Sequence, residues 1–207
     1  MGLRERRIVE SGYDAIASQY LDARVEGEDV ALLSELVEHL RPGDRVLDAG
    51  CGAGVPVMAL LVDAGLDLAG LDLSKVQLET ARSHLGDASL VQGDLAALPF
   101  GDGSFTALVS YYAIVHVPRS QHLTVFGEVR RVLVPDGWAL LCLGANDLPA
   151  DHDPTSWLGA PMFWSHFDAR TNLRLLGEVG LAVVRHHLVA DPMGHGEHLF
   201  ALVSRRR

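Results

Sequence analysis

The chain has 207 residues, nearly half of them hydrophobic, and a formal net charge of −10. This length and composition exclude a disordered chain and suit one domain with a full hydrophobic core, so we expect a single domain over residues 1–207. The acidic balance excludes a basic face, and we therefore expect no nucleic-acid partner.

Cysteine and histidine usage gives no sign of a metal. The two cysteines, Cys51 and Cys142, are too few for a disulfide framework or a zinc site. None of the ten histidines forms an H-x-x-x-H pair beside a carboxylate. No apolar run reaches the ~18–20 residues that cross a bilayer, and residues 1–7 are charged without the apolar stretch of a signal peptide. We expect a soluble cytoplasmic protein with no metal and no membrane partner.

From residue 28 onward, helical and strand patterns alternate along the chain. We expect helices over residues 28–40, 55–64, 75–84, 121–134 and 168–177, and strands over 45–49, 67–72, 88–92, 104–111, 138–143, 181–188 and 198–204. Pro135-Asp136-Gly137 reads as a turn, and residues 145–167 read as irregular.

This alternation predicts an α/β fold with a doubly wound, mostly parallel sheet of seven strands. The last two strands are joined by only about ten residues without a helix, which is too short for a parallel crossover. We therefore expect the last strand to run antiparallel.

The first expected strand ends in the glycine-rich run Asp48-Ala49-Gly50-Cys51-Gly52-Ala53-Gly54. Glycines let the backbone pass close to a ligand because they carry no Cβ. A dinucleotide site uses G-x-G-x-x-G, whereas here the third glycine comes one residue early and Asp48 places a carboxylate where a phosphate would sit. The pattern argues against a nicotinamide cofactor and favours a ligand that brings a cation, such as an amine.

This run resembles the first motif of the class I methyltransferases that use S-adenosylmethionine, whose glycine-rich turn holds the methionine end of the cofactor. The resemblance covers roughly residues 10–204 and includes the sheet with its reversed last strand. It implies a Rossmann-like fold, S-adenosylmethionine as the cofactor, and cofactor contacts at Asp48, Gly50, Cys51, Gly52 and Gly54.

The second expected strand ends at Asp72, 18 positions after Gly54. A carboxylate in this place accepts hydrogen bonds from both hydroxyls of a ribose, and the family resemblance implies that role for Asp72. The alternative is that Asp72 only caps the next helix, but Ser74 already fills the cap position. Leu73 and Gln77 would then lie along the adenine.

The third expected strand leads into Gly93-Asp94-Leu95-Ala96-Ala97-Leu98-Pro99-Phe100. This segment resembles the family's G-D-x-x-x-L-P-F motif, in which the aspartate accepts from the adenine amino group and the next amide donates to the ring. The resemblance implies these roles for Asp94 and Leu95; the alternative is an ordinary loop aspartate.

The fourth expected strand ends at Ser110-Tyr111-Tyr112, on the edge of the sheet where ligands bind in α/β folds. Similar family segments pass below the sulfonium, which implies that Ser110 and Tyr111 contact the methionine portion and that Tyr112 faces the acceptor. The Asn/Asp-Pro-Pro-Tyr tetrad of enzymes that methylate nucleobase or glutamine amines is absent here. Nucleic-acid and amide acceptors are therefore disfavoured.

Residues 1–27 resemble the cap helix of the small-molecule members. Tyr13 and Tyr20 fall two turns apart on one helix face, with Ala17 between them. The resemblance implies that Tyr20 closes over the cofactor and that Tyr13 contacts the acceptor, although plain packing of an amphipathic helix explains both residues almost as well.

His116 is our candidate general base, because imidazole titrates near neutrality and can accept a proton from an attacking hydroxyl. The alternative is that His116 only lines the pocket. Residues 145–167 are expected to form a substrate lid, since long irregular loops in compact domains are usually functional and aromatic walls suit a small-molecule pocket. Acceptor contacts expected there are Trp157, Met162, Phe163, Trp164 and His166, with His166 as a second candidate base.

These observations predict a methyltransferase that acts on an oxygen, nitrogen or carbon nucleophile of a small organic molecule. The main alternative is a protein that binds S-adenosylmethionine without catalysis, as a sensor or scaffold. An RNA or protein methyltransferase would need a basic or extended docking face that the sequence does not contain. The identity of the acceptor and the oligomeric state stay open.

Overall fold

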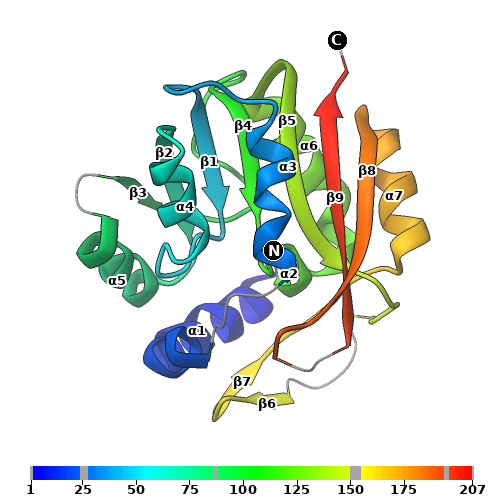
Figure 1. Cartoon of the computed structure of the whole chain (residues 1–207). Coiled ribbons are helices and arrows are strands. Elements are labelled where there is room, and N and C mark those ends of the chain that lie inside the picture. The colour runs from blue at the N-terminus through cyan, green and yellow to red at the C-terminus, as the bar shows by residue number, and fades with distance from the viewer. Residues whose placement is uncertain (1, 24–27, 86–87, 150–154, 194–195, 207) are drawn as a thin grey trace.

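The computed structural model describes residues 2–23, 28–85, 88–149, 155–193 and 196–206. A seven-stranded sheet with the order β3-β2-β1-β4-β5-β9-β8 forms its centre (Figure 1). Strand β9 pairs antiparallel with both β5 and β8, while β1 to β5 run parallel. The expected fold and the reversed last strand are confirmed. The strands are β1 (Arg45–Ala49), β2 (Asp67–Asp72), β3 (Ser89–Gln92), β4 (Phe105–Ser110), β5 (Leu133–Gly144), β8 (Leu181–Ala190) and β9 (Glu197–Arg205).

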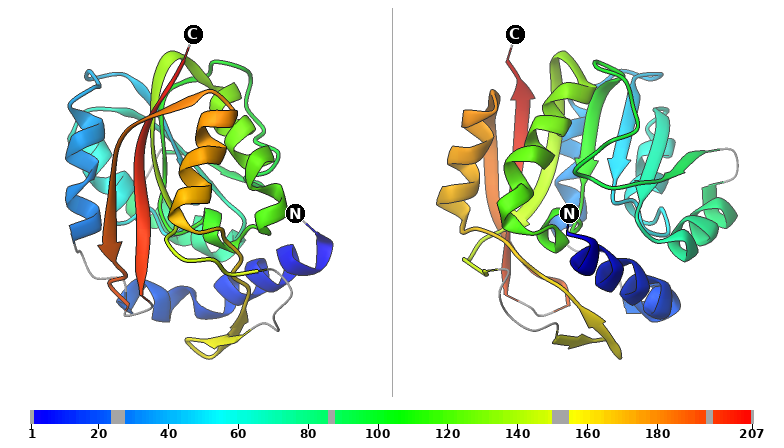
Figure 2. Two further views of the ribbon diagram at one scale, coloured as in Figure 1. Left: turned by 90° about the vertical axis from the view of Figure 1, so that its right-hand side faces the viewer. Right: turned by 180° about the vertical axis from the view of Figure 1, so that it is seen from behind.

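Helices cover both faces of this sheet (Figure 2). One face packs against α2 (Glu28–Ala31), α3 (Leu33–Val37), α4 (Val57–Asp63) and α5 (Lys75–Leu85), and the other against α6 (His122–Val132) and α7 (Ala169–Glu178). Strands β1 and β4 are buried almost along their whole length. Their continuous apolar sequence follows from this burial on both faces.

Three expectations about secondary structure are wrong in detail. The helix expected over residues 28–40 breaks at Leu32 into α2 and α3, and ends at Val37. The turn at Pro135-Asp136-Gly137 does not precede β5 but bulges within it, since pairing with β4 jumps from Leu133 to Trp138. Asp136 has a φ of +62° there. The three expected turn residues therefore form a bulge, and the strand continues on either side of it.

The segment expected to be irregular contains a hairpin of β6 (Thr155–Trp157) and β7 (Ala160–Met162). Its two turn residues, Leu158 and Gly159, both have positive φ, as a tight hairpin turn requires. A leucine in that conformation is uncommon, so the sequence carries no clear hairpin signal.

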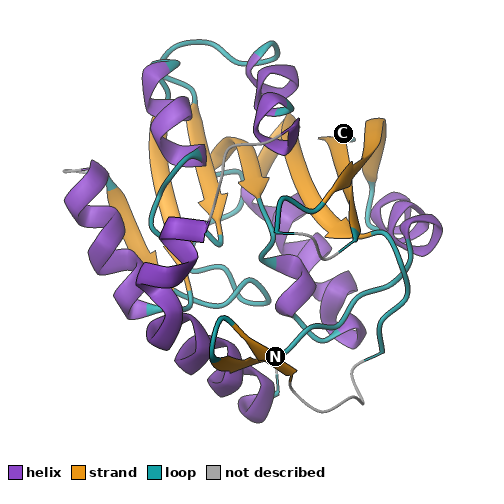
Figure 3. Cartoon of the chain, turned by 60° about the horizontal axis from the view of Figure 1, so that its bottom comes forward, coloured by secondary structure: helices purple, strands orange, loops and turns teal. Residues whose placement is uncertain are grey.

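Helix α1 (Leu3–Ala23) and this hairpin lie together across the carboxyl ends of the parallel strands (Figure 3). They share a hydrophobic cluster separate from the sheet's two cores, formed by Val9, Ile16, Ala160, Met162 and Phe163. Residues 24–27 of the expected cap and 150–154 of the expected lid lie outside the described residues.

Within the part of the chain that the structure describes, no helix has both the length and the apolar character of a membrane span.

Candidate functional site

The glycine-rich turn after β1 is fixed by backbone contacts to β2. The amides of Gly50 and Cys51 both donate to the carbonyl of Leu71, at 2.7 and 3.0 Å. Gly50 has a φ of +93°, and a Cβ there would overlap the Cβ of Ala113. Glycine is therefore required at Gly50 both by the backbone conformation and by the close approach of the loop after β4.

Two carboxylates, those of Asp48 and Asp72, lie near the carboxyl ends of β1 and β2. Asp48 is 2% exposed, and burial, with a smaller contribution from the charge of Asp72, raises its pKa to about 8. Burial also raises the pKa of Asp72, against hydrogen bonds from the amides of Gly52 and Ser74, each at 2.8 Å. Because burial and mutual repulsion both disfavour two charges here, a bound cation would stabilise the ionised pair.

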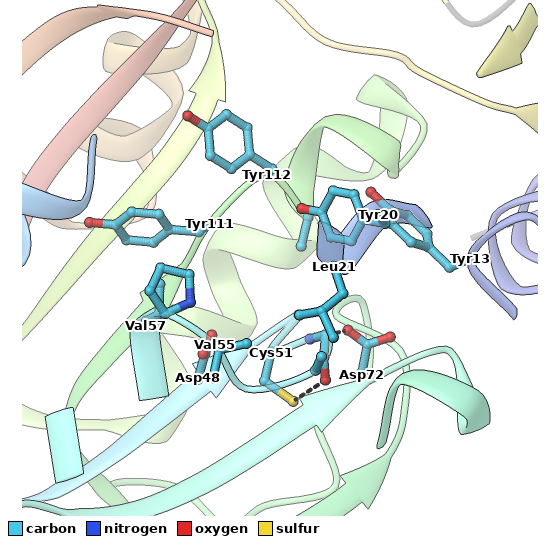
Figure 4. A pocket seen from close by; sticks show the side chains of 15 residues that line it. Tyr13, Tyr20, Leu21, Asp48, Cys51, Val55, Val57, Asp72, Tyr111 and Tyr112 are labelled. Atoms are coloured by element: carbon cyan, nitrogen blue, oxygen red, sulfur yellow. Dashed lines mark hydrogen bonds between the residues drawn. The ribbon is translucent and has the colours of Figure 1, made fainter. Parts of the chain in front are cut away.

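Three adjoining cavities open at this edge of the sheet, and Tyr13 lines all of them. The turn cavity, of about 660 Å³, contains Asp48, Asp72 and the glycine-rich turn under the tyrosines of α1 (Figure 4). The loop cavity, of about 490 Å³, is lined by Asp72, Leu73, Asp94 and Leu95 among others. The aromatic cavity is the largest, at about 900 Å³ including its opening to solvent. Most of the sequence-predicted residues thus surround these three cavities.

The loop after β3 is clamped onto α6. The guanidinium of Arg131 donates to the carbonyls of Leu98 at 3.0 Å and Phe100 at 2.7 Å. Glu128 accepts from the amide of Leu98 at 2.7 Å and pairs with Arg131. At the start of the same loop, the Asp94 side chain accepts from the amide of Ala96. Hydrogen bonds at both ends of the loop therefore fix the wall that Asp94 contributes to the loop cavity.

Helix α1 is tied to the start of α5. The Asp14 carboxylate accepts from the Ser74 hydroxyl at 2.5 Å and from the Val76 amide at 3.3 Å. Ser74 in turn accepts from the amide of Gln77 at 3.1 Å, which confirms its expected capping role. Tyr13 and Tyr20 are thereby positioned opposite Asp48 and Asp72 (Figure 4).

His116 sits in a short 3₁₀ turn, η1 (Ile114–His116), with two partners that fix its tautomer. Its Nδ1 lies 2.7 Å from the carbonyl of Phe163, which can only accept, so Nδ1 carries the proton. Nε2 therefore accepts from the Tyr13 hydroxyl, at 2.9 Å. Burial lowers the pKa of His116 to about 4, which keeps the ring neutral at pH 7 with a lone pair directed at Tyr13.

The aromatic cavity is walled by rings from four parts of the chain. The expected acceptor contacts Tyr13, Tyr112, His116, Trp157 and Trp164 line it, together with Tyr20, which the sequence assigned to the cofactor.

The sequence analysis missed four residues that line the cavity, namely Asp191, Pro192 and Met193 after β8 and His198 on β9. Asp191 accepts from His198 Nε2 at 2.8 Å. No sequence motif marks these residues; the sheet topology brings them to the site. Strand β9 pairs antiparallel with β5, which sets His198 opposite Gly144 at the carboxyl end of β5.

Six expected site residues line none of the three cavities. Gly54, at a φ of +78°, faces α5, where a Cβ would come within 2.3 Å of the Leu85 side chain. The Ser110 hydroxyl donates to the carbonyl of Ala49, and Gln77 is buried beneath the glycine-rich turn near Gly52. The other three are the buried side chains of Met162 and Phe163, which pack in the cluster with α1, and His166, whose Nδ1 donates to the carbonyl of Asn146.

Comparison with known proteins identifies the family. Residues 46–137 match the model of a methyltransferase domain. An uncharacterised methyltransferase of Synechocystis is 33% identical over 163 residues, which are 73% of this chain and 73% of that protein. The chain belongs to the class I S-adenosylmethionine-dependent methyltransferases. The expected family and its cofactor are confirmed.

Other relatives share parts of this methyltransferase. The rice protein named 24-methylenesterol C-methyltransferase 2 is 39% identical over 120 residues, and the match covers 55% of this methyltransferase but only 31% of the rice protein. The 1,6-didemethyltoxoflavin-N1-methyltransferase of Burkholderia thailandensis superposes with a TM-score of 0.79 at 18% identity, covering 99% of this chain and 90% of its own. A putative methyltransferase of Haloferax volcanii superposes with a TM-score of 0.76 at 20% identity, covering 96% and 98%. At these identities the structural likeness establishes the fold.

The turn cavity fits the cofactor of the family. Among the described residues that line it, none is a lysine or arginine, while Asp48 and Asp72 both contribute carboxylates. S-adenosylmethionine carries an ammonium group and a sulfonium, so it supplies the positive charge that this buried pair requires.

Proposed function

We propose that this methyltransferase transfers a methyl group from S-adenosylmethionine to an oxygen, nitrogen or carbon nucleophile of a small organic acceptor. The observation that carries the proposal is the junction of the carboxylate-lined turn cavity with the aromatic cavity at Tyr13. Two ligands bound on either side of Tyr13 would meet there. When bound, the cofactor supplies a methyl group that is already activated on a positively charged sulfur.

On the cofactor side, we assign Asp48 to the ammonium end and Asp72 to the ribose hydroxyls. The Asp72 carboxylate accepts from backbone amides, those of Gly52 and Ser74 at 2.8 Å each, and its two oxygens offer about four lone-pair sites in all. Asp94 and Leu95, on the loop clamped by Arg131, are assigned to the adenine. The remaining proposed contacts are Tyr20, Gly50, Cys51, Gly52, Leu73 and Tyr111.

On the acceptor side, the chain's contribution is to orient the nucleophile, exclude water and remove a proton. Orientation of two bound reactants contributes roughly 7–11 kcal/mol. The Tyr13 hydroxyl takes the nucleophile's proton as it passes its own to Nε2 of His116. Burial lowers the pKa of His116 to about 4, below the near-neutral value expected from the sequence, so Nε2 is a weaker base than an ordinary imidazole. General base catalysis adds about 10²–10⁴-fold in rate. The proposed acceptor contacts are Tyr13, Tyr112, His116, Trp157 and Trp164.

Mass spectrometry of reactions with a metabolite panel tests this function. We expect one substrate to gain the mass of a single methylene as S-adenosylhomocysteine accumulates in equal amount. Cofactor binding without any methylated product over a broad panel would instead favour a non-catalytic sensor or scaffold.

Calorimetry of Asp72→Ala tests the cofactor side separately. Loss of the ribose contacts should weaken S-adenosylmethionine binding at least tenfold, since hydrogen bonds to a charged group contribute about 1.5–3 kcal/mol. Asp67→Ala, at the exposed opposite end of β2, is the matched control and should leave the affinity unchanged. Equal affinities of the two variants would remove the ribose assignment.

A further inference from the structure

We infer that the aromatic cavity recognises its acceptor through a positively charged nitrogen, either a protonated amine or a quaternary ammonium group. The inference rests on the proposed function, because it names the class of molecule that the acceptor-side cavity takes. Three features of the described residues support it: a wall of rings in contact with one another, a buried carboxylate, and a lining without lysine or arginine.

The rings contact one another in a chain centred on Trp157. Its ring centroid lies 5.5 Å from that of Tyr20, 5.9 Å from that of Tyr13 and 5.8 Å from that of Trp164. Trp and Tyr faces attract cations through their quadrupole, and the attraction strengthens when water is excluded. Each of these rings also lines the cavity, so a cation inside would meet several of them at once.

Among the described lining residues of the cavity, Asp191 is the one acidic side chain, and none is a lysine or arginine. Asp191 is a lining residue whose side chain is only 10% exposed, and its position is fixed by bonds from His198 Nε2 and from the Met193 amide at 2.6 Å. A second carboxylate stands behind the wall, since the Tyr112 hydroxyl donates to the Asp29 side chain at 3.2 Å.

An anionic acceptor would lack an available cationic partner among the described lining residues, because the imidazole of His198 already binds the Asp191 carboxylate at 2.8 Å. The described lining contains no lysine or arginine, and His116 is neutral at pH 7 because burial lowers its pKa to about 4. A buried anion without a partner is strongly disfavoured. Asp191 lines the aromatic cavity but not the turn cavity, so an acceptor cation beside it would be separated from the positive charge of the cofactor.

Tryptophan fluorescence provides a direct binding test. Of the three tryptophans, Trp157 and Trp164 line the cavity, whereas Trp138 lies on β5 and stacks on His39. The full chain, saturated with S-adenosylhomocysteine, is titrated with choline and with 3,3-dimethylbutan-1-ol. The alcohol has the same shape but carries carbon in place of the charged nitrogen. We expect choline to quench at concentrations at least tenfold lower than the alcohol.

Variants then separate charge from shape. Asp191→Asn should weaken choline binding about fivefold or more and leave the alcohol unaffected, while Glu79→Gln, an exposed acid on α5, should change neither. Tyr20→Phe should keep choline binding and Tyr20→Leu should reduce it, which provides a second readout if Asp191→Asn does not fold.

Equal affinities for the two probes, or equal effects of Asp191→Asn on both, would overturn the inference. Cofactor binding is measured separately by calorimetry. A protein that binds S-adenosylhomocysteine but does not prefer choline contradicts only this inference, whereas a protein that binds no cofactor contradicts the proposed function.

Discussion

The buried carboxyl group of Asp48 makes cofactor binding depend on pH. Its pKa is about 8 in the free protein, mainly because of burial. At pH 7, roughly nine in ten molecules therefore carry a protonated Asp48, and ionising the group costs about 1.4 kcal/mol for each pH unit below its pKa. A cationic ligand beside Asp48 requires the ionised form. We expect affinity for S-adenosylmethionine to rise about tenfold per unit between pH 5.5 and 7, with release of about 0.9 protons at pH 7.

Titration calorimetry in buffers of different ionisation enthalpy measures both quantities. The series stops at pH 7 because an α-amino group such as that of the ligand titrates itself near pH 8. Asp48→Asn cannot ionise, so its affinity should stay flat over this range and its binding should release no proton from this site. A flat affinity in the wild-type protein, or the same proton release in the variant, would refute the assignment of Asp48 to the ligand's cation.

The same raised pKa affects the stability of the free protein. Between the ordinary value of 3.8 and about 8, the folded state keeps the Asp48 proton that the unfolded chain has released. The contribution of this group to folding stability therefore falls as pH rises through that window. Thermal unfolding should show a steeper loss of stability from pH 5 to 7.5 in wild type than in Asp48→Asn. Parallel curves for the two proteins would contradict this account.

Three further substitutions test other parts of the site. Gly50→Ala should lower the free energy of unfolding, measured by chemical denaturation, by about 1–3 kcal/mol or more, because the new Cβ meets Ala113. The control Gly43→Ala, also at positive φ but in open space, should lower it less. His116→Ala should reduce turnover about 10²–10⁴-fold and leave cofactor affinity nearly intact in calorimetry; full activity would exclude it as the base. Arg131→Ala should raise the cofactor Kd about five- to tenfold by freeing the loop carbonyls, with no change in acceptor KM.

The cofactor half was predictable because its constraints are local in the sequence. Each constraint lies at the end of a strand. The glycine-rich turn follows β1, Asp72 is the last residue of β2, and the segment from Asp94 to Phe100 follows β3. The carboxyl ends of parallel strands meet at one edge of the sheet. Alternation of strands and helices therefore fixed where Asp48, Asp72 and Asp94 come together. The cap of α5 by Ser74 followed from the same local reasoning.

The acceptor half could not be predicted in the same way. The β6–β7 hairpin depends on Leu158 at positive φ, which the packing of the strands against α1 imposes and propensity disfavours. Gly12 shows the same dependence, since a Cβ there would press on the carbonyl of Pro161 at 2.8 Å. Asp191 and His198 join the cavity only because β9 lies beside β5. The acceptor side of the site is formed by contacts between segments far apart in the sequence, and such contacts cannot be predicted from residue spacing.

A structure of the protein with S-adenosylhomocysteine tests the central claim most directly. We expect the ligand in the turn and loop cavities, with both ribose hydroxyls on Asp72, the amine beside Asp48 and the sulfur facing Tyr13. Binding of the ligand at another place, or failure to capture it at saturating concentration, would contradict the account.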